Sequence, residues 1–308
     1  MLIEILGSAA GGGFPQWNCA CANCVALRSG MFAGKARTQT QVAVSGDGIS
    51  WFLLNASPDL RLQIEATEVL HPKHGTRSSP IAGVVLTSAD LDQIAGLLSL
   101  RELQPFRLYC TRSLRRILQE DNSAFAMLNR IPQQVEWTVV EPGEAFALTG
   151  IDGQDAGVRC EAFSIGTRYP CYVRAEPGRY APNEASLGLM ITSREGRKLI
   201  YLPAICEVNQ ALLERMESAD LLLIDGTFWT DDELIKVQVG GSTARQMGHL
   251  PVSPEDGSLK KLASLRKPRK VFIHVNNTNP MLNESGTEYR EVRAAGWEIA
   301  EDGWSIIL

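Results

Sequence analysis

Three cysteines lie close together near the start of the sequence, as Cys19, Cys21 and Cys24. Their C-x-C-x-x-C spacing, on a loop after a glycine-rich turn, allows three thiolates to converge on one tetrahedral zinc at S–Zn distances of about 2.3 Å. A fourth ligand must then come from elsewhere in the chain. The alternative is that three small apolar side chains are simply buried together. We expect a structural zinc site, because free cysteines are uncommon enough to make a chance cluster the weaker explanation.

The chain has four histidines, and two of them, His249 and His274, lie in short motifs that also contain glycine or asparagine. The other two, His71 and His74, belong to a polar loop, where we expect them to be solvated. Two histidines and one carboxylate form the ligand set of non-haem iron(II) oxygenases, which leaves positions open for O₂ and substrate. A buried core position for His274 and a plain loop position for His249 are the simpler alternatives. The sequence therefore permits a mononuclear oxidative metal site.

Carboxylates for such a site occur at two strand ends. Asp90 and Asp92 lie where a strand-like run changes into a helical pattern. They could instead cap that helix, because the exposed N–H groups of a first turn favour carboxylates. Asp225 ends a buried apolar run, where an unpaired carboxylate would be costly, so a metal, a cation or backbone donors must satisfy it. We expect Asp225 to orient the metal ligands by hydrogen bonds rather than to bind the metal itself.

The elements that position these residues follow from the apolar patterns. Strand-like runs in the first ninety residues occur at 2–6, 41–45, 51–55 and 83–87, with a hairpin signal at 46–48 and a helical pattern at 90–103. The second half repeats this plan, with a hairpin at 188–193 and 198–202, helices at 208–216 and 259–265, and strands at 221–225 and 271–274. Two β-rich halves, each with helices, predict two sheets packed face to face with helices outside.

Length and composition indicate an ordinary globular protein. The chain has 308 residues, of which 44% are hydrophobic and 21% charged, and we expect one domain over residues 1–308. The net charge of −5 and the absence of a long basic run exclude nucleic acid as the expected partner. No apolar run approaches the roughly 18 residues of a membrane span, and no secretory signal precedes the first strand, so we expect a cytoplasmic protein without a membrane partner. Clustered cysteines in such a protein are more often metal ligands than disulfide partners.

The motifs also resemble a known family. Metallo-β-lactamase-fold enzymes carry Thr-His-x-His-x-Asp-His where a strand meets a helix, and here residues 87–93 read Thr-Ser-Ala-Asp-Leu-Asp-Gln. Further landmarks are Asn-Ala-Ser-Pro-Asp at 55–59, Asp-Gly-Thr-Phe-Trp at 225–229, Met-Gly-His-Leu-Pro at 247–251 and Phe-Ile-His-Val-Asn-Asn-Thr-Asn-Pro at 272–280. Together with the loop that carries Cys19, Cys21 and Cys24, which we call the cysteine loop, they resemble the PqqB family over nearly the whole chain. The resemblance implies an α/β metallo-β-lactamase fold, a four-layer αββα sandwich.

The resemblance also implies a substrate and roles for individual residues. The family is linked to iron-dependent oxidation, by hydroxylation, of the tyrosine-derived, glutamate-cross-linked precursor of pyrroloquinoline quinone (PQQ). By this resemblance, Asp92, His249 and His274 are the expected iron(II) ligands, and Asp90 is a fourth ligand or orients the others. In related proteins with the cysteine site, the fourth zinc ligand lies three residues beyond the last active-site histidine, and Asn277 occupies that position here.

Departures from the family pattern limit this interpretation. Gln93 stands where the family commonly has histidine, and an amide oxygen is the weaker ligand for iron, so we treat Gln93 as a site residue with altered metal affinity. The hydrolytic ligands are missing at Ser88 and Ala204, and residues 161–167 contain no histidine, which disfavours a zinc hydrolase or phosphodiesterase. A non-catalytic carrier for PQQ or its small-molecule precursor remains the main alternative. The oligomeric state, including a homodimer, is left open by the sequence.

Overall fold

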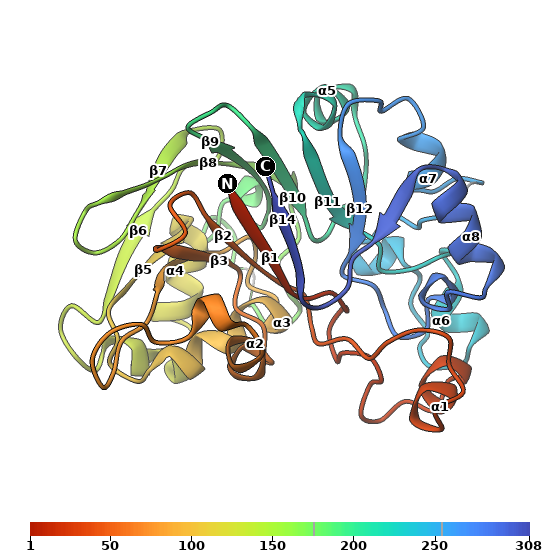
Figure 1. Cartoon of the computed structure of the whole chain (residues 1–308), viewed down its shortest axis with the longest axis horizontal. Coiled ribbons are helices and arrows are strands. Elements are labelled where there is room, and N and C mark those ends of the chain that lie inside the picture. The colour runs from red at the N-terminus through yellow and green to blue at the C-terminus, as the bar shows by residue number, and fades with distance from the viewer. Residues whose placement is uncertain (175, 254) are drawn as a thin grey trace. The chain divides into compact units, whose positions relative to one another are not determined.

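The chain is described by a computed structural model that covers residues 1–174, 176–253 and 255–308. It divides into two compact units (Figure 1). Unit 1 comprises Met1–Leu6, Gln41–Lys198 and Gly303–Leu308, and unit 2 comprises Gly7–Thr40 and Leu199–Asp302. One domain over residues 1–308 therefore stays a prediction. Within the described ranges, no helix has the length and apolar character needed to cross a membrane.

Unit 1 is built on a mixed sheet with the strand order β14-β1-β2-β3-β4-β5-β6. The expected hairpin at 46–48 joins β2 and β3, where Asp47 accepts hydrogen bonds from the N–H groups of Ile49 and Ser50, both at 2.8 Å. From β3 to β6 the strands pair in parallel. The strands are β1 (Leu2–Gly7), β2 (Gln41–Ser45), β3 (Trp51–Leu54), β4 (Ile81–Val85), β5 (Phe106–Cys110), β6 (Val135–Val139) and β14 (Trp304–Ile307).

Helices and a second group of strands cover the two faces of this sheet (Figure 1). One face packs Leu60, Ile94 and Leu114 of the helices into a buried core with the strands. On the other face, Tyr109 of β5 stacks on Phe146 of β7 at a centroid distance of 5.3 Å. The helices are α2 (Leu60–Ala66), α3 (Leu91–Ile94) and α4 (Arg112–Gln119), and the antiparallel strands are β7 (Ala145–Thr149), β8 (Asp155–Gly166) and β9 (Ser186–Ser193).

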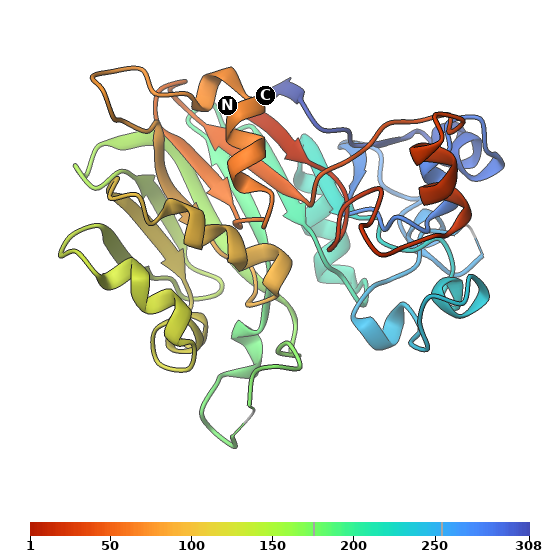
Figure 2. The ribbon, with the colours of Figure 1, turned by 90° about the horizontal axis from the view of Figure 1, so that it is seen from below.

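Short 3₁₀ helices complete unit 1, at Glu68–Leu70, Ala95–Leu100, Ser123–Asn129 and Pro182–Glu184. The described residues between β8 and β9, 167–174 and 176–185, form the green lobe of Figure 2.

Unit 2 contains parallel strands whose carboxyl ends carry candidate metal-site residues. The pairs β10·β11, β11·β12 and β12·β13 are all parallel, and β11 is buried at every position, as expected for a parallel strand with both faces covered. Ligand sites in parallel sheets lie beyond the carboxyl ends of the strands. The strands are β10 (Lys198–Leu202), β11 (Leu221–Asp225), β12 (Arg269–Ile273) and β13 (Trp297–Ile299).

The helices of unit 2 are α1 (Ala22–Arg28), α5 (Gln210–Ser218), α6 (Glu233–Lys236), α7 (Ser258–Lys261) and α8 (Thr287–Ala294), with 3₁₀ helices at Arg245–Met247 and Pro280–Leu282.

Residues 275–279, which follow β12 and His274, form a turn that we call the arch. A buried carboxyl group, Glu233 of α6, supports it. The hydroxyl of Thr278 donates a short hydrogen bond to Glu233, and the Asn276 amide donates to that hydroxyl at 2.6 Å. The other Glu233 oxygen accepts from the backbone N–H of Trp229 at 2.5 Å. Burial raises the pKa of Glu233 to about 7, although these hydrogen bonds act in the opposite direction.

This raised pKa makes stability depend on pH. The folded chain keeps the Glu233 proton up to about pH 7, whereas the unfolded chain loses it near pH 4.5, so stability must fall as pH rises through this window. We expect the free energy of unfolding of the wild type to fall by up to roughly 3 kcal/mol relative to E233Q across the window. Urea unfolding of reduced, metal-free protein at several pH values measures this. The exposed Glu214→Gln variant is the control, and equal pH profiles for all three proteins would contradict the expectation.

Candidate functional site

Two histidines and one aspartate converge at the carboxyl ends of β11 and β12. Asp225 is the last residue of β11, and His274 directly follows β12. His249 lies in the loop after the 3₁₀ helix Arg245–Met247. One potential ligand atom from each of the three residues lies within 4.8 Å of the others. The two imidazole rings stack at a centroid distance of 5.5 Å with an interplanar angle of 22°.

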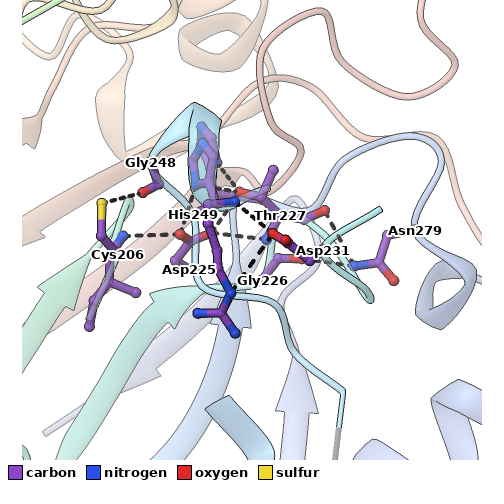
Figure 3. A network of polar contacts seen from close by, with 11 residues as sticks. Cys206, Asp225, Gly226, Thr227, Asp231, Gly248, His249 and Asn279 are labelled. Atoms are coloured by element: carbon purple, nitrogen blue, oxygen red, sulfur yellow. Dashed lines mark hydrogen bonds and ion pairs between the residues drawn. The ribbon is translucent and has the colours of Figure 1, made fainter. Parts of the chain in front are cut away.

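The Asp225 carboxylate is fully buried and accepts four hydrogen bonds (Figure 3). Its Oδ2 accepts from the backbone N–H of Ile205 at 3.0 Å and from Nδ1 of His249 at 2.8 Å. Its Oδ1 accepts from the backbone N–H and the hydroxyl of Thr227, at 2.9 and 2.6 Å. A carboxylate offers about four acceptor positions, so these donors saturate it. Asp225 thus hydrogen-bonds directly to one expected metal ligand, His249, and its role as an orienting group rather than a ligand stays a prediction.

Electrostatics keep this carboxyl group ionised. Burial would raise the pKa of Asp225, but attraction to His249, the hydrogen bond from that ring and attraction to His274 outweigh burial and lower the pKa. An ionised Asp225 is the strongest available acceptor for the nearby donors.

The same network sets the tautomer of both histidines. A hydroxyl has one proton, and the Thr227 hydroxyl has two pure acceptors for it, Asp225 at 2.6 Å and the His274 carbonyl at 2.9 Å. Its oxygen is then an acceptor for Nδ1–H of His274, which lies 2.8 Å away. His249 donates its own Nδ1–H to Asp225. Both rings therefore carry the proton on Nδ1 and the lone pair on Nε2, which is the form of imidazole that binds a metal.

The loop that carries His249 is tied to the segment after β10. The thiol of Cys206 donates to the carbonyl of Gly248 at 3.0 Å (Figure 3), and the N–H of Leu250 donates to the carbonyl of Ile205 at 2.6 Å. Gly248 has a φ of +95°, a left-handed conformation that glycine adopts without strain. These contacts fix His249 beside Asp225.

The cysteine cluster forms a second candidate metal site in unit 2. Cys19 and Cys24 are buried, Cys21 is half-buried, and their sulfur atoms lie within 4.8 Å of one another. The side-chain amide nitrogen of Asn277 lies 3.2 Å from Cys19 Sγ, 3.5 Å from Cys21 Sγ and 3.3 Å from Cys24 Sγ. Burial raises the pKa of Cys21 to about 11, so metal binding must displace a proton from this thiol.

This arrangement fits a tetrahedral zinc. Three thiols and one amide group surround a common point, and zinc accepts both sulfur and oxygen ligands. In the structure Asn277 directs its amide nitrogen at the sulfurs. A half-turn of the amide would direct its oxygen there instead, as a zinc ligand requires.

The two aspartates expected to complete the oxidative site lie in unit 1, at the turn between β4 and α3. Asp90 occupies the N-cap position of α3 without a side-chain cap hydrogen bond, and instead accepts from the Ser88 hydroxyl at 2.7 Å. Asp92 lies in the first turn of α3. Asp90, Asp92 and Gln93 thus belong to unit 1, whereas His249 and His274 belong to unit 2. The structure describes the two parts of the expected set separately, so their combination stays a prediction.

Gln93 is a buried hydrogen-bond acceptor. Its side-chain oxygen accepts from the Asn55 amide at 2.9 Å, the Thr87 hydroxyl at 2.6 Å and the Ser88 hydroxyl at 3.3 Å. Asn55, with a φ of +69°, also accepts from the N–H of Thr87. The Gln93 oxygen, the atom that could bind iron, is therefore surrounded by donors in this structure.

A hollow of about 490 Å³ opens in unit 2, where Cys19 of the cysteine cluster is one of its lining residues. Its lining combines apolar and amide side chains, including Phe228, Met247, Asn18, Asn276 and Asn277, and none of its lining residues is charged. Phe228 also meets the ring of His249 edge to face at 5.8 Å.

Sequence reasoning missed two residues that the geometry makes important, Thr227 and Asn23. Thr227 belongs to a motif that we had singled out, and a hydroxyl two residues after a strand-end aspartate was the available signal. Asn23 lies between two of the clustered cysteines, but its partners are more than 250 positions away in the sequence.

Known proteins match the chain over its whole length. The β-lactamase superfamily domain model matches residues 50–275. Coenzyme PQQ synthesis protein B of Methylococcus capsulatus is 41% identical over 311 residues, covering 100% of both proteins. The protein of the same name from Gluconobacter oxydans is 44% identical over 307 residues, covering 99% of this chain and 98% of the relative.

Solved structures agree with these matches. The crystal structure of zinc-bound PqqB from Methylobacterium extorquens is 40% identical, covers 100% of both chains and has a TM-score of 0.91. A diphosphatase of the PhnP family, at 21% identity and a TM-score of 0.67, covers 100% of this chain and 97% of its own and shares the fold. These matches confirm the expected α/β fold class, the metallo-β-lactamase fold with its four-layer αββα sandwich, and the resemblance seen in the motifs. The chain belongs to the coenzyme PQQ synthesis protein B family of the β-lactamase superfamily.

Proposed function

We propose that this chain acts in PQQ biosynthesis by oxidising, through hydroxylation, the tyrosine-derived, glutamate-cross-linked precursor, with iron(II) as the catalytic metal. Membership of the family supports the pathway. The observation that carries the chemistry is the hydrogen-bond network of Asp225 and Thr227, which places the lone pairs of His249 and His274 on Nε2. Two such imidazoles are the neutral ligands of an iron(II) oxygenase site.

The third ligand in this proposal, Asp92, comes from the family motif, with Asp90 as a further ligand or an orienting group. Iron(II) bound at these residues would supply the activation of O₂. Hydroxylation would place one oxygen atom of O₂ in the substrate and release the other as water, which requires two electrons and two protons from an added two-electron reductant and solvent. In unit 2, Asp225 orients His249 directly and His274 through Thr227. The saturated Asp225 carboxylate keeps this geometry without binding the metal itself.

We also propose that the cysteine cluster binds a structural zinc. The zinc-bound state of the Methylobacterium extorquens relative supports zinc as a resident metal. Cys19, Cys21 and Cys24 supply three sulfur ligands, and the amide oxygen of Asn277 would supply the fourth after its half-turn. This zinc would keep the cysteine loop packed on the arch.

A carrier that binds PQQ or its precursor without turnover is the second candidate. The uncharged hollow beside His249 is large enough for a small molecule, which favours binding in either case. A hydrolase is a weaker candidate, because two metals and a bridging hydroxide need ligands that Ser88, Gln93 and Ala204 do not provide.

The zinc proposal predicts the effect of removing one thiolate. Cys21→Ser should lower zinc affinity at least about tenfold, since even outer partners of a metal site cost this much. The melting temperature should fall with zinc content, because metal binding and folding are coupled. Metal analysis and thermal melts measure both. Cys171→Ser, at an exposed cysteine outside the cluster, is the control, and an unchanged zinc content in C21S would refute the assignment.

The role of Gln93 can be tested with two substitutions. Gln93→Met removes the acceptor at nearly constant volume, and stranding the buried donors of Asn55 and Thr87 should cost roughly 2 to 4 kcal/mol of unfolding free energy. We expect Gln93→His to be destabilised as well and to bind iron no more tightly than the wild type. Urea unfolding and iron titration measure these quantities. Tighter iron binding by Q93H would show instead that position 93 reaches the metal.

The oxidation itself predicts a product and a loss of function. With reconstituted iron, reductant and precursor, we expect O₂ uptake and a mass gain of one oxygen atom. His274→Ala should abolish both while the cysteine-bound zinc remains, because the two sites use different residues. The exposed His74→Ala variant is the control.

Two results would replace this proposal. Tight binding of the quinone without O₂ consumption under any metal would establish the carrier. Hydrolysis of chromogenic esters or β-lactams that is abolished by Asp92→Ala would establish the hydrolase.

A further inference from the structure

Asn23 lies between the candidate zinc ligands Cys21 and Cys24 and contacts the opposite end of the sequence. Its side-chain amide donates to the carbonyl of Asn277 and to the carbonyl of Asn279, both at 3.1 Å. An asparagine amide has two N–H donors, so both are used on the backbone of the arch. Both views of the fold place α1 beside the C-terminal segments of unit 2 (Figures 1 and 2).

The other side of the arch is fixed to the turn that carries Thr227. The Asn279 amide donates to the carbonyls of Gly226 and Thr227 at 3.0 and 3.3 Å, and the N–H of Asn276 donates to the Thr227 carbonyl at 3.0 Å. The arch is therefore held between two supports. Asn23 holds it to the cysteine loop, and Asn279 holds it to the turn whose hydroxyl accepts from His274.

His274, immediately before the arch, has an unfavourable backbone conformation. Its φ is +60°, a left-handed value that costs a residue with a side chain on the order of 1 to 3 kcal/mol and persists only where surrounding contacts enforce it. The next residue, Val275, exchanges backbone hydrogen bonds with Ser8 and Ala10 at 3.0 and 2.9 Å. The arch supplies the remaining constraint on the chain that leaves His274.

We propose that Asn23 is a positioning residue for His274. By fixing the arch to the cysteine loop, Asn23 keeps the His274 backbone left-handed and its Nδ1 against Thr227. The residue that Asn23 holds by its carbonyl, Asn277, is also the one whose side chain meets the three sulfurs. The cysteine cluster and His274 are thus mechanically linked, and binding of a metal at one site strengthens binding at the other. The part of this inference that concerns metal affinity rests on the proposed function, whereas the positioning of the His274 ring does not.

The test compares Asn23→Ala with Asn283→Ala. Asn283 has the same side chain and similar exposure, but it lies beyond the arch, and its side-chain oxygen accepts from the N–H of Ser285 at 3.1 Å. Nitrogen NMR of metal-free protein labelled at histidine resolves ring signals from only four residues. N23A should shift the His274 ring nitrogens and weaken their Nδ1–H tautomer preference, while His71 and His74 stay unchanged. N283A should match the wild type.

Cobalt(II) titration gives the second measurement. The thiolate charge-transfer band of N23A should remain, which shows that the cysteine cluster still binds metal. Affinity at the histidine site should fall about tenfold, as for other outer partners of a metal site. If N23A does not fold, Asn23→Gln keeps both donors on a longer side chain and should give a smaller shift in the same direction.

The outcomes separate the two proposals. Identical His274 signals in N23A and the wild type, with only a lower melting temperature, would overturn the positioning role. Shifted His274 signals in a protein whose wild type binds no metal at His274 would support the positioning role and refute the proposed iron site.

Discussion

The buried carboxylate of Asp225 orders unit 2 around itself, because a charge without solvent contact must have every acceptor position filled. Its donors come from separate segments: the loop after β10 through Ile205, the loop of His249, and the turn of Thr227. Thr227 extends the set to His274. Displacing any one segment would leave a buried charge partly unpaired, so the segments keep one another in place.

In the absence of metal, different interactions hold the two candidate metal sites in place. His249 donates a strong, charge-assisted hydrogen bond to Asp225, and His274 donates to the Thr227 hydroxyl beside Asp225. These bonds exist whether or not an ion is bound. The cysteine loop is held by the Asn23 amide, which donates to two carbonyls of the arch, by the Asn277 amide, whose sulfur acceptors are weak, and by the Arg28 side chain, which donates to the carbonyl of Cys19 at 2.5 Å. Metal loss should therefore loosen the cysteine loop first, and Asn23 and the arch would transmit that change to His274.

Much of the fold could be predicted from apolar patterns, and the failures have physical reasons. The strands at 41–45 and 221–225 have the predicted bounds, since each is a short run with an apolar centre, and its length favours a strand over a helix. The helix predicted at 90–103 ends as an α-helix at Ile94 and continues as a 3₁₀ helix. There the backbone of Ala56 accepts from Gly96 and donates to Gln93, contacts that no local pattern encodes.

The candidate site, like the fold, could be predicted from the sequence only in part. Cysteine spacing and scarce histidines identified the groups with metal chemistry, because residue type alone carries that information. Thr227 and Asn23 were missed, since their roles depend on acceptors supplied by distant segments.

In the turn before α3, polar side chains are satisfied by hydrogen bonds within the protein and need no metal ion. Where related enzymes place imidazoles, the Ser88 hydroxyl lies 2.7 Å from Asp90 and 3.3 Å from the Gln93 oxygen, and Gln93 also accepts from Thr87 and Asn55. At this edge the hydroxyl and the amide have protein hydrogen-bond partners, so no ion is needed to satisfy them. Loss of the ion therefore does not strain the turn, and the chain can keep this framework without a dinuclear centre. The imidazoles of unit 2 are each fixed through one carboxylate, which is the arrangement that the proposed single-metal site requires.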